Sequence, residues 1–191
     1  MTVLGFTITF HSPFRVGAAY ARDGVDAAVD LDDPLPADSL KGLMRAAAGE
    51  LLGGDHRAVA AVFGTPARPS PWSWSAARPP GRGWSQADLS GSRHRVTINP
   101  GTHSAVKDHL LLGEQVWVPS ARFEVTRTGF LDAGGLPEAD QVLVLRCAAG
   151  GVHGLGAWRR RGLGWAGIIP DDGEISEADV SRLLALAGER Q

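Results

Sequence analysis

The sequence is poor in cysteine and contains no long hydrophobic run. Only one of its 191 residues is a cysteine, Cys147, which excludes a disulfide framework and a cysteine-rich zinc site. No apolar stretch approaches the roughly 18 residues that a membrane-spanning helix needs. The opening segment MTVLGFTITF lacks the basic region and long apolar stretch of a signal peptide. We therefore expect a cytoplasmic protein with no membrane partner.

Signature motifs of several enzyme classes are also missing. The six histidines show neither a His-Glu-x-x-His motif nor another paired spacing, so a zinc hydrolase is not indicated. No Gly-x-Ser-x-Gly motif is present, which leaves acyl hydrolysis without support. The glycine-rich run at residues 150–165 contains no Gly-Lys-Ser or Gly-Lys-Thr, and no helical pattern follows it. This run is therefore neither a P-loop nor a dinucleotide-binding loop.

Length and composition predict one loop-rich globular domain over residues 1–191. The chain is long enough for a sizeable core, with 43% hydrophobic and 21% charged residues. The 25 glycines are about twice the average share, which favours many turns. We therefore expect a folded chain with long loops.

Charge is distributed unevenly along the chain. The net charge of −2 argues against a bulk electrostatic attraction to nucleic acid. Six aspartates and no basic residue lie between residues 23 and 38, five arginines and one aspartate lie between 68 and 95, and three arginines are consecutive at 159–161. These basic segments are candidates for phosphate contacts, although a GC-rich genome is an alternative explanation for the abundance of arginine.

Hydrophobic periodicity predicts the elements of the first third of the chain. Apolar residues alternate over 4–10, the two-residue period of a half-buried strand, and a long acidic loop follows at 12–37. Asp38 or Ser39 is then expected to cap a helix that ends at Gly53. Its apolar face carries Leu40, Leu43, Met44, Ala47 and Leu51. A second short helical segment is expected from Asp55 to Gly64.

The rest of the chain predicts strands and one further helix. Residues 65–92 are rich in Pro, Ser, Trp, Arg and Gly, so we expect an exposed insertion there. Strand patterns follow at 93–98, 114–118, 121–126, 142–147 and 165–169, and Ser176 with Asp179 predicts the capping box of a C-terminal helix. This order predicts an α+β fold, ferredoxin-like or RNA-recognition-motif-like, with long loop insertions and a glycine-rich C-terminal loop.

Two segments carry residues suited to phosphate binding. Lys41 and Arg45 are one turn apart on the first helix, and Ser39 lies at its positive end. A solvated basic pair is the alternative interpretation. In the glycine-rich run, three arginines are phosphate donors, Trp158 is a candidate for stacking on a base, and glycines leave room for a ligand. The residues concerned are Gly154, Gly156, Arg159, Arg160, Arg161, Gly162 and Gly164. The alternative is a hairpin with exposed charges.

The acidic loop is a third candidate. Aspartates such as Asp26 in residues 24–33 can bind Mg²⁺ or position an attacking hydroxyl group. The spacing is not that of an EF-hand, and a solvated acidic loop is the alternative.

The order of these segments resembles the RAMP superfamily of RNA-binding proteins. The run PADSLKGLMR, followed by VFG at 62–64, is similar to the family pattern P-G-S-S-L-K-G-x-x-R … L-F-G. RVTINPGTHSA at 95–105, with EQV at 114–116, resembles its central segment. RGLG at 161–164 resembles its C-terminal loop, and PFRVG at 13–17 its opening motif. The resemblance covers residues 3–169.

This resemblance implies a guide-RNA-binding backbone subunit of a type III CRISPR effector complex, which serves in antiviral defence. The guide RNA would run across the helix with Ser39, Lys41 and Arg45, across Arg15 of the opening motif, and across the glycine-rich loop. The expected partners are guide CRISPR RNA, complementary target RNA, other effector subunits and copies of the same chain.

The resemblance also implies a catalytic residue. GVDAAV at 24–29 is similar to the family context G-G-I-D-N-P-V, although Asp23 replaces its first glycine, and the aspartate of that context supports metal-dependent cleavage of target RNA. Asp26 is then the catalytic candidate, with Mg²⁺ or a similar divalent cation as cofactor. Ala27 and Ala28 replace the Asn-Pro pair, and Asn99 replaces a central aspartate. These departures keep open a non-catalytic structural or capping subunit. A guide-processing endoribonuclease is a less favoured alternative, because such enzymes generally contain two of these folds.

Overall fold

A computed structural model describes residues 1–18, 22–130 and 135–189. In chain order its elements are β1 (Val3–Phe10), α1 (Ala37–Leu52), α2 (Arg57–Phe63), β2 (Trp72–Trp74), the 3₁₀ turn η1 (Gln86–Asp88), β3 (Leu89–Ile98), β4 (Ala105–Val116), β5 (Ser120–Arg127), α3 (Glu138–Gly150), the 3₁₀ turn η2 (Arg159–Arg161), β6 (Ala166–Pro170) and α4 (Glu177–Gly188).

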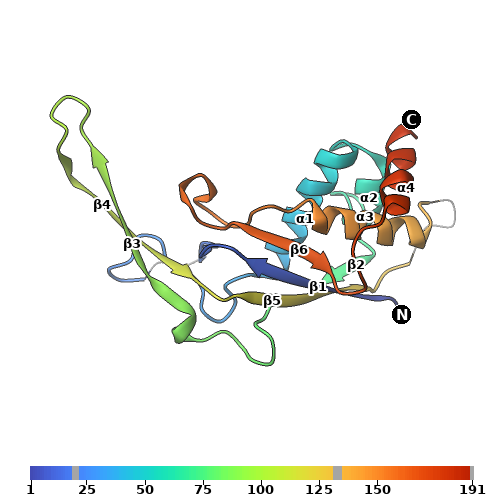
Figure 1. Ribbon diagram of the computed structural model, residues 1–191, viewed down its shortest axis with the longest axis horizontal. Helices are drawn as coiled ribbons and strands as arrows, with labels where there is room; N and C mark the ends of the chain where they lie inside the picture. Colours follow the sequence, from blue (N-terminus) through green and yellow to red (C-terminus); the bar gives the residue numbers. More distant parts are fainter. Residues whose placement is uncertain (19–21, 131–134, 190–191) are drawn as a thin grey trace.

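Four of the strands form one antiparallel sheet in the order β2-β5-β1-β6. With α1 between β1 and β2, and α3 between β5 and β6, this is the βαββαβ arrangement of a ferredoxin-like fold. The helices lie on one side of the sheet (Figure 1). The predicted α+β, ferredoxin-like class is therefore confirmed.

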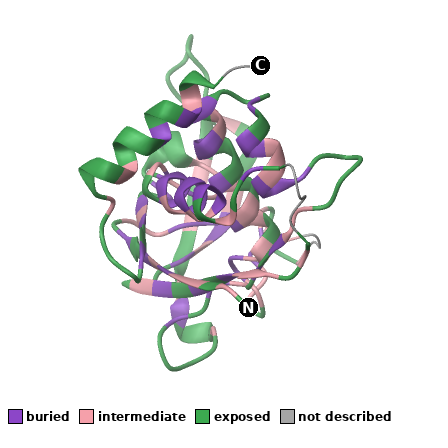
Figure 2. Cartoon of the chain, turned by 90° about the vertical axis from the view of Figure 1, so that its right-hand side faces the viewer, coloured by how far each residue is buried: buried purple, intermediate pink, exposed green. Residues whose placement is uncertain are grey.

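The core lies between the sheet and the helices. Phe6 and Ile8 of β1 point toward the helices and are fully buried, as are Leu40 and Met44 of α1. Phe6 stacks on Phe123 of β5, with 5.2 Å between the ring centroids. Figure 2 shows the buried residues gathered between the two layers. The alternation over residues 4–10 thus predicted the central strand correctly.

The predicted end of α1 and the predicted start of α4 are confirmed, whereas the predicted start of α1 is wrong. Gly53 follows α1 as expected, and the capping box of Ser176 and Asp179 begins α4. Helix α1, however, begins at Ala37 after Pro36, without a side-chain cap, so the expected cap at Asp38 or Ser39 is wrong. Ser39 lies in the first turn instead. Within the described ranges, no helix combines the length and apolarity needed to cross a membrane.

The strand expected at 142–147 is wrong, because these residues lie in α3. This helix packs against α1, α2, α4 and β6, so most of its sides are buried. A helix buried on most sides needs apolar residues at nearly every position and loses its 3.6-residue period. A short apolar run of this kind cannot be told from a buried strand by periodicity alone.

The prediction of an exposed insertion at 65–92 is wrong for residues 72–74. Trp72–Trp74 form β2, an edge strand of the main sheet, in which Trp74 pairs with Val125. Both tryptophan side chains are buried, and the indole N–H of Trp72 donates a hydrogen bond to Gln141 Oε1 over 2.8 Å. Prolines and serines around this short strand conceal it in the sequence.

The element that does project from the domain is the hairpin of β3 and β4. It forms a separate two-stranded sheet and extends away from the helical layer (Figure 1). The strand patterns at 93–98 and 114–118 predicted only parts of it, since β4 begins at Ala105. The base of this hairpin contacts two of the loops that the sequence singled out.

Candidate nucleic-acid interface

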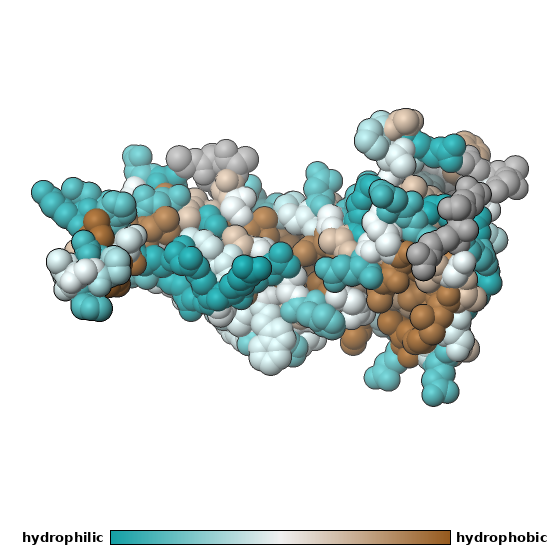
Figure 3. Space-filling model, turned by 90° about the horizontal axis from the view of Figure 1, so that it is seen from above, coloured by the Kyte–Doolittle hydropathy of each residue, from teal (hydrophilic) through white to brown (hydrophobic). Residues whose placement is uncertain are grey.

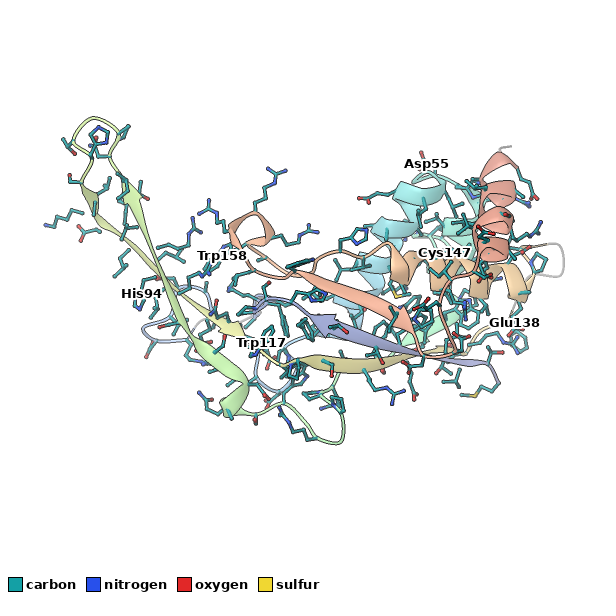
Figure 4. The ribbon with its side chains drawn as sticks, viewed as in Figure 1. Asp55, His94, Trp117, Glu138, Cys147 and Trp158 are labelled. Carbon is teal, nitrogen blue, oxygen red and sulfur yellow. The ribbon has the colours of Figure 1, made fainter. Side chains whose placement is uncertain are left out.

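Three segments that are distant in sequence meet at the base of the hairpin. The acidic loop runs beside β4, where the Ala27 N–H donates to Leu112 O over 3.1 Å and the Glu114 N–H donates to Ala27 O over 3.0 Å. The glycine-rich loop approaches β4 through Trp158, whose ring packs so closely on Gly113 that a Cβ there would overlap with it. Figure 4 shows Trp158 beside the hairpin strands.

Glu114 fixes the acidic loop to the hairpin. Its side chain is buried, and it accepts a hydrogen bond from the Val29 N–H over 3.0 Å. Its other oxygen pairs with Arg22 Nη1 at 2.7 Å, and Arg22 Nη2 also donates to Val29 O. The loop that carries Asp26 is therefore held on both sides of that residue.

Asp26 is exposed at the surface of this loop. Its Oδ2 accepts a hydrogen bond from the Leu112 N–H over 2.8 Å, so one carboxylate oxygen already has a structural partner. Among the described residues, no three His, Cys, Asp or Glu side chains are grouped so that they could hold a metal ion. Mg²⁺ usually keeps several waters and binds one or two carboxylates together with substrate phosphates. Asp26 fits a hydrated ion of that kind and not a closed protein cage.

Trp158 contacts two arginines from different segments. The guanidinium carbons of Arg15 and Arg95 lie 4.9 and 5.1 Å from the centroid of its ring. Trp158 itself adopts a left-handed backbone conformation, with φ of 60°. The ring therefore joins the hairpin to the glycine-rich loop through cation–π contacts, instead of standing free for a base as its sequence context suggested.

Arg15 also holds the acidic loop from within the protein. Its side chain is buried and donates to Ala27 O over 3.3 Å and to Ala28 O over 3.4 Å. Burial lowers the pKa of Arg15, and the nearby Glu114 carboxylate acts in the opposite direction. The structure thus gives Arg15 a stabilising role, and its predicted contact with RNA stays a prediction.

The glycines of the C-terminal loop allow the chain to approach itself. Gly156 and Gly164 have φ of 76° and 74°, and a Cβ at either residue would overlap with a carbonyl oxygen of Arg15 or Leu155. At Gly154 a Cβ would lie 3.2 Å from Gly164 O, whereas at Gly162, with φ of 79°, it would meet open space. Apart from Gly162, these glycines make room for the protein's own backbone and not for a ligand.

The three consecutive arginines form the exposed turn η2, and Arg93 Nη1 donates to Arg161 O across the loop boundary. We call Arg93, Arg95, Arg159, Arg160 and Arg161 the basic surface. Within the described residues, none of these five guanidinium groups forms an ion pair with a carboxylate. Ion pairs with carboxylates are formed instead by Arg22, Arg57, Arg82, Arg122, Arg127, Arg146 and Arg182.

Lys41 and Arg45 share one face of α1, as predicted, but this face is turned away from the glycine-rich loop. Lys41 Nζ lies 5.5 Å from the centroid of the Trp74 ring, and Arg45 Nη1 donates to Gly64 O over 3.1 Å. Different residues of α1 face the loop, about half a turn around the helix. The structure therefore does not bring Lys41 and Arg45 close to the arginines of the glycine-rich loop.

A groove of about 580 Å³ separates α1 from the glycine-rich loop. Sequence reasoning missed two residues that line it, the exposed Trp165 and Glu50. Trp165 was expected only as the start of a strand, and its place directly after the RGLG run was the signal available. Its lining includes Leu43, Ala46, Glu50, Arg159, Arg160 and Trp165.

Comparison with protein-family models identifies one family. Residues 7–166 match the sequence model of the RAMP superfamily, while no curated protein matches the chain. A chain in a solved structure described as "Cryo-EM structure of the Type III-B Cmr-beta bound to cognate target RNA" is similar, with a TM-score of 0.59 and 18% sequence identity. The match covers 87% of this chain and 58% of that one, and it supports the fold. With the family match spanning most of its length, the chain belongs to the RAMP superfamily.

Proposed function

We propose that this protein binds guide RNA as a subunit of a type III CRISPR ribonucleoprotein complex. The observation that carries the proposal is the basic surface, where five guanidinium groups from the hairpin and the glycine-rich loop form no ion pair with any carboxylate in the described part of the chain. Membership of the RAMP superfamily supports it, as does the fold shared with a chain of a Cmr complex bound to target RNA.

The basic surface is suited to a phosphate backbone. Guanidinium groups make charge-assisted, often bidentate hydrogen bonds to phosphate oxygens. Their binding releases condensed counterions, so the affinity depends on salt even though the whole chain carries a net charge of only −2. Because the surface joins β3 to η2, an RNA strand bound there would pass the exposed Asp26 loop at the base of the hairpin.

The hairpin supplies a second contact with RNA. Val96 of β3 and Leu110 of β4 lie opposite each other and are both more than half exposed, and Ile98 nearby is exposed as well. In Figure 3 the projecting end of the molecule carries such apolar spots among hydrophilic residues. Apolar side chains on a projecting element can enter between stacked bases. We assign the hairpin to the guide–target duplex on this basis.

Asp26 is the proposed catalytic residue for cleavage of target RNA. In this reaction a ribose 2′-oxygen attacks the adjacent phosphorus and its proton passes to a base. The bond from phosphorus to the 5′-oxygen breaks, and the 5′-oxygen keeps the electron pair and takes a proton from water, which leaves a 2′,3′-cyclic phosphate and a 5′-hydroxyl group. The carboxylate of Asp26 is exposed and only its Oδ2 accepts the hydrogen bond from the Leu112 N–H, so in this proposal it would accept that proton or orient the hydroxyl group. A hydrated Mg²⁺, when bound, would neutralise charge on the phosphate.

A non-catalytic structural or capping subunit is the second candidate. It is favoured by one observation, the hydrogen bond from Leu112 N–H to Asp26, which gives this carboxylate a role in the fold. In that case other subunits cut the target, and the loop only shapes the RNA path.

The first experiment isolates tagged protein from its host cell and sequences the RNA that accompanies it. Short guides with a common repeat-derived end, together with partner subunits, are the expected result. Protein that carries neither guides nor partner subunits would overturn the proposal.

A second experiment tests the basic surface in purified protein by fluorescence anisotropy with a single-stranded RNA oligonucleotide. The variant R159Q/R160Q/R161Q should bind the RNA more weakly. The negative slope of log affinity against log salt should become smaller in magnitude by about 2, because three phosphate contacts are lost. The matched control R57Q/R122Q/R182Q removes three arginines that already have carboxylate partners, and so it changes the net charge equally. Equal losses for both variants would contradict the assignment.

A further inference from the structure

We propose that Trp165 is a stacking platform that holds one base of the bound RNA in the groove between α1 and the glycine-rich loop. This inference rests on the proposed RNA binding and names a contact within it. Trp165 is 64% exposed, although it directly precedes β6, an edge strand of the main sheet whose first residue, Ala166, is buried. Tryptophan is enriched at surfaces where another molecule binds, because one end of its ring system is apolar and the indole N–H is polar.

The backbone of Trp165 is firmly held although its ring is exposed. Its N–H donates to Ser12 Oγ over 2.9 Å, and its carbonyl oxygen accepts from the His11 N–H over 2.8 Å. The His11 ring lies 4.8 Å from the indole, at an angle of 45°. The indole is therefore presented in a fixed position, which lowers the entropy cost of stacking on it.

The groove beside Trp165 has the chemistry of a nucleotide site. Leu43 and Ala46 of α1 provide an apolar floor, and Arg159 and Arg160 provide two cationic groups at the loop side. Its volume of about 580 Å³ falls within the ~300–1,000 Å³ of small-molecule sites. A base on the indole would place its phosphates near the arginines. Glu50 also lines the groove, but two guanidinium groups against this one carboxylate leave the lining net positive, which favours RNA over an apolar protein segment as the occupant.

The aromatic residues in the other expected places do not serve this purpose. The Trp158 ring is occupied by the guanidinium groups of Arg15 and Arg95. In RNA-recognition motifs the open face of the sheet stacks bases on aromatic residues. Here that face carries the ion pair of Arg122 with Asp171.

The open face is further closed to bases by the position of Asp171. Its carboxylate accepts from Thr7 Oγ1 over 2.6 Å, and it lies so close over Gly5 that a Cβ there would overlap with it. Gly5 and Thr7, the two residues of the central strand β1 that Asp171 covers, have no aromatic side chain. Among the residues that the structure describes, Trp165 is the exposed aromatic side chain beside Arg159 and Arg160 of the basic surface.

The test compares three variants for binding to a single-stranded RNA oligonucleotide by fluorescence anisotropy. Trp165→Ala should lower the affinity about tenfold, whereas Trp165→Phe should keep most of it, because stacking tolerates another aromatic ring. Trp117→Ala is the matched control, since Trp117 is 40% exposed and does not line the groove. Trp117 directly follows β4, and Figure 4 labels it near the end of that strand, apart from Trp158.

Two further readouts separate stacking from electrostatics and from misfolding. The salt dependence of Trp165→Ala should equal that of the wild type, because no phosphate contact is lost. An oligomer of abasic ribose phosphates should bind the wild type and Trp165→Ala equally. Circular dichroism confirms that each variant is folded. Trp165→Leu, which keeps an apolar side chain but cannot stack, replaces Trp165→Ala where that variant does not fold, and it should show the same loss of affinity.

The outcomes distinguish this inference from the proposed function. If the wild type binds no RNA, the proposed function fails and the inference with it. If the wild type binds RNA through its basic surface, but Trp165→Ala binds as tightly as Trp117→Ala, the stacking platform alone is overturned.

Discussion

The carboxylate of Glu114 and the backbone N–H of Val29 are joined by a hydrogen bond of 3.0 Å that ties the acidic loop to the hairpin. The two residues are 85 positions apart, and the bond is buried. Together with the Arg22 ion pair, it fixes a loop whose sequence has no regular period. The surface position of Asp26 therefore depends on a residue of β4.

Replacement of Glu114 should release this loop. We expect Glu114→Ala to lower the free energy of unfolding by about 2–3 kcal/mol, because a buried N–H and a charged guanidinium group lose their partner. Hydrogen exchange at residues 22–29 should also become faster. Urea denaturation and exchange measured by mass spectrometry check both effects, with Glu124→Ala on the exposed face of β5 as control. Unchanged exchange in the loop would contradict the anchoring role.

Asp26 offers a direct test of the catalytic proposal. In the assembled complex, Asp26→Ala and Asp26→Asn should both abolish target cleavage while RNA binding changes less than about twofold, because neither variant touches the basic surface. Asn keeps an oxygen for the Leu112 N–H but cannot accept the proton. Gel analysis of labelled target RNA measures cleavage, and Asp23→Ala is the neighbouring control. Normal cleavage by Asp26→Asn would support the non-catalytic candidate.

Local sequence patterns predicted the elements whose residues face one consistent environment. β1 alternates because one face meets the core, and α4 begins with a capping box that needs only Ser176 and Asp179. The run around Val142 misled because α3 is buried on most sides, and Trp72 was missed because a three-residue strand has no period to detect. Such features are decided by tertiary packing, which local pattern does not contain.

The candidate site shows the same limit. The sequence indicated three candidate segments, which are α1, the acidic loop and the glycine-rich loop. The two loops meet at the base of the hairpin, and α1 does not. The sequence did not show that Arg15 and Trp158 would be engaged with each other, or that Lys41 would turn toward Trp74. Those outcomes depend on which side of each element faces a neighbour. Trp165 carried a signal only through its exposure, which is a property of the folded chain.

The two RGLG glycines should differ sharply in their tolerance of a side chain. Gly164→Ala introduces a Cβ that overlaps with Leu155 O, and Gly162→Ala meets only open space. Both glycines have positive φ, so each substitution carries the left-handed penalty of about 1 kcal/mol. We expect Gly162→Ala to cost about that amount and Gly164→Ala at least about 3 kcal/mol. Urea denaturation of both variants measures the free energy of unfolding. Equal losses of this free energy would contradict the close approach of Gly164 to the Leu155 carbonyl oxygen.

Glu50 should weaken RNA binding in the groove. Its carboxylate lines the same groove as Arg159 and Arg160, where it repels phosphate. We expect Glu50→Gln to raise the affinity for RNA about two- to fivefold at low salt and to lose this advantage at high salt, because salt screens the repulsion. Anisotropy titrations over a salt series measure this, with Glu177→Gln on α4 as control. A loss of affinity would show instead that the carboxylate contacts a base.

The ion pair of Asp88 with Arg82 should make the base of the hairpin sensitive to acid. Hydrogen bonds from Arg82 hold the pKa of Asp88 below its ordinary value of 3.8, since both guanidinium nitrogens reach its carboxylate at 2.6 and 2.7 Å. A carboxyl group whose pKa is lowered by folding adds stability that is complete above its unfolded pKa. That stability is lost as the pH falls through the lowered folded value. The wild type should therefore exceed Asp88→Asn in free energy of unfolding at pH 6, and the difference should shrink below pH ~4. Denaturation of both proteins across pH 2–7 measures it, and a difference that stays constant down to pH 2 would show that the charge of Asp88 contributes nothing.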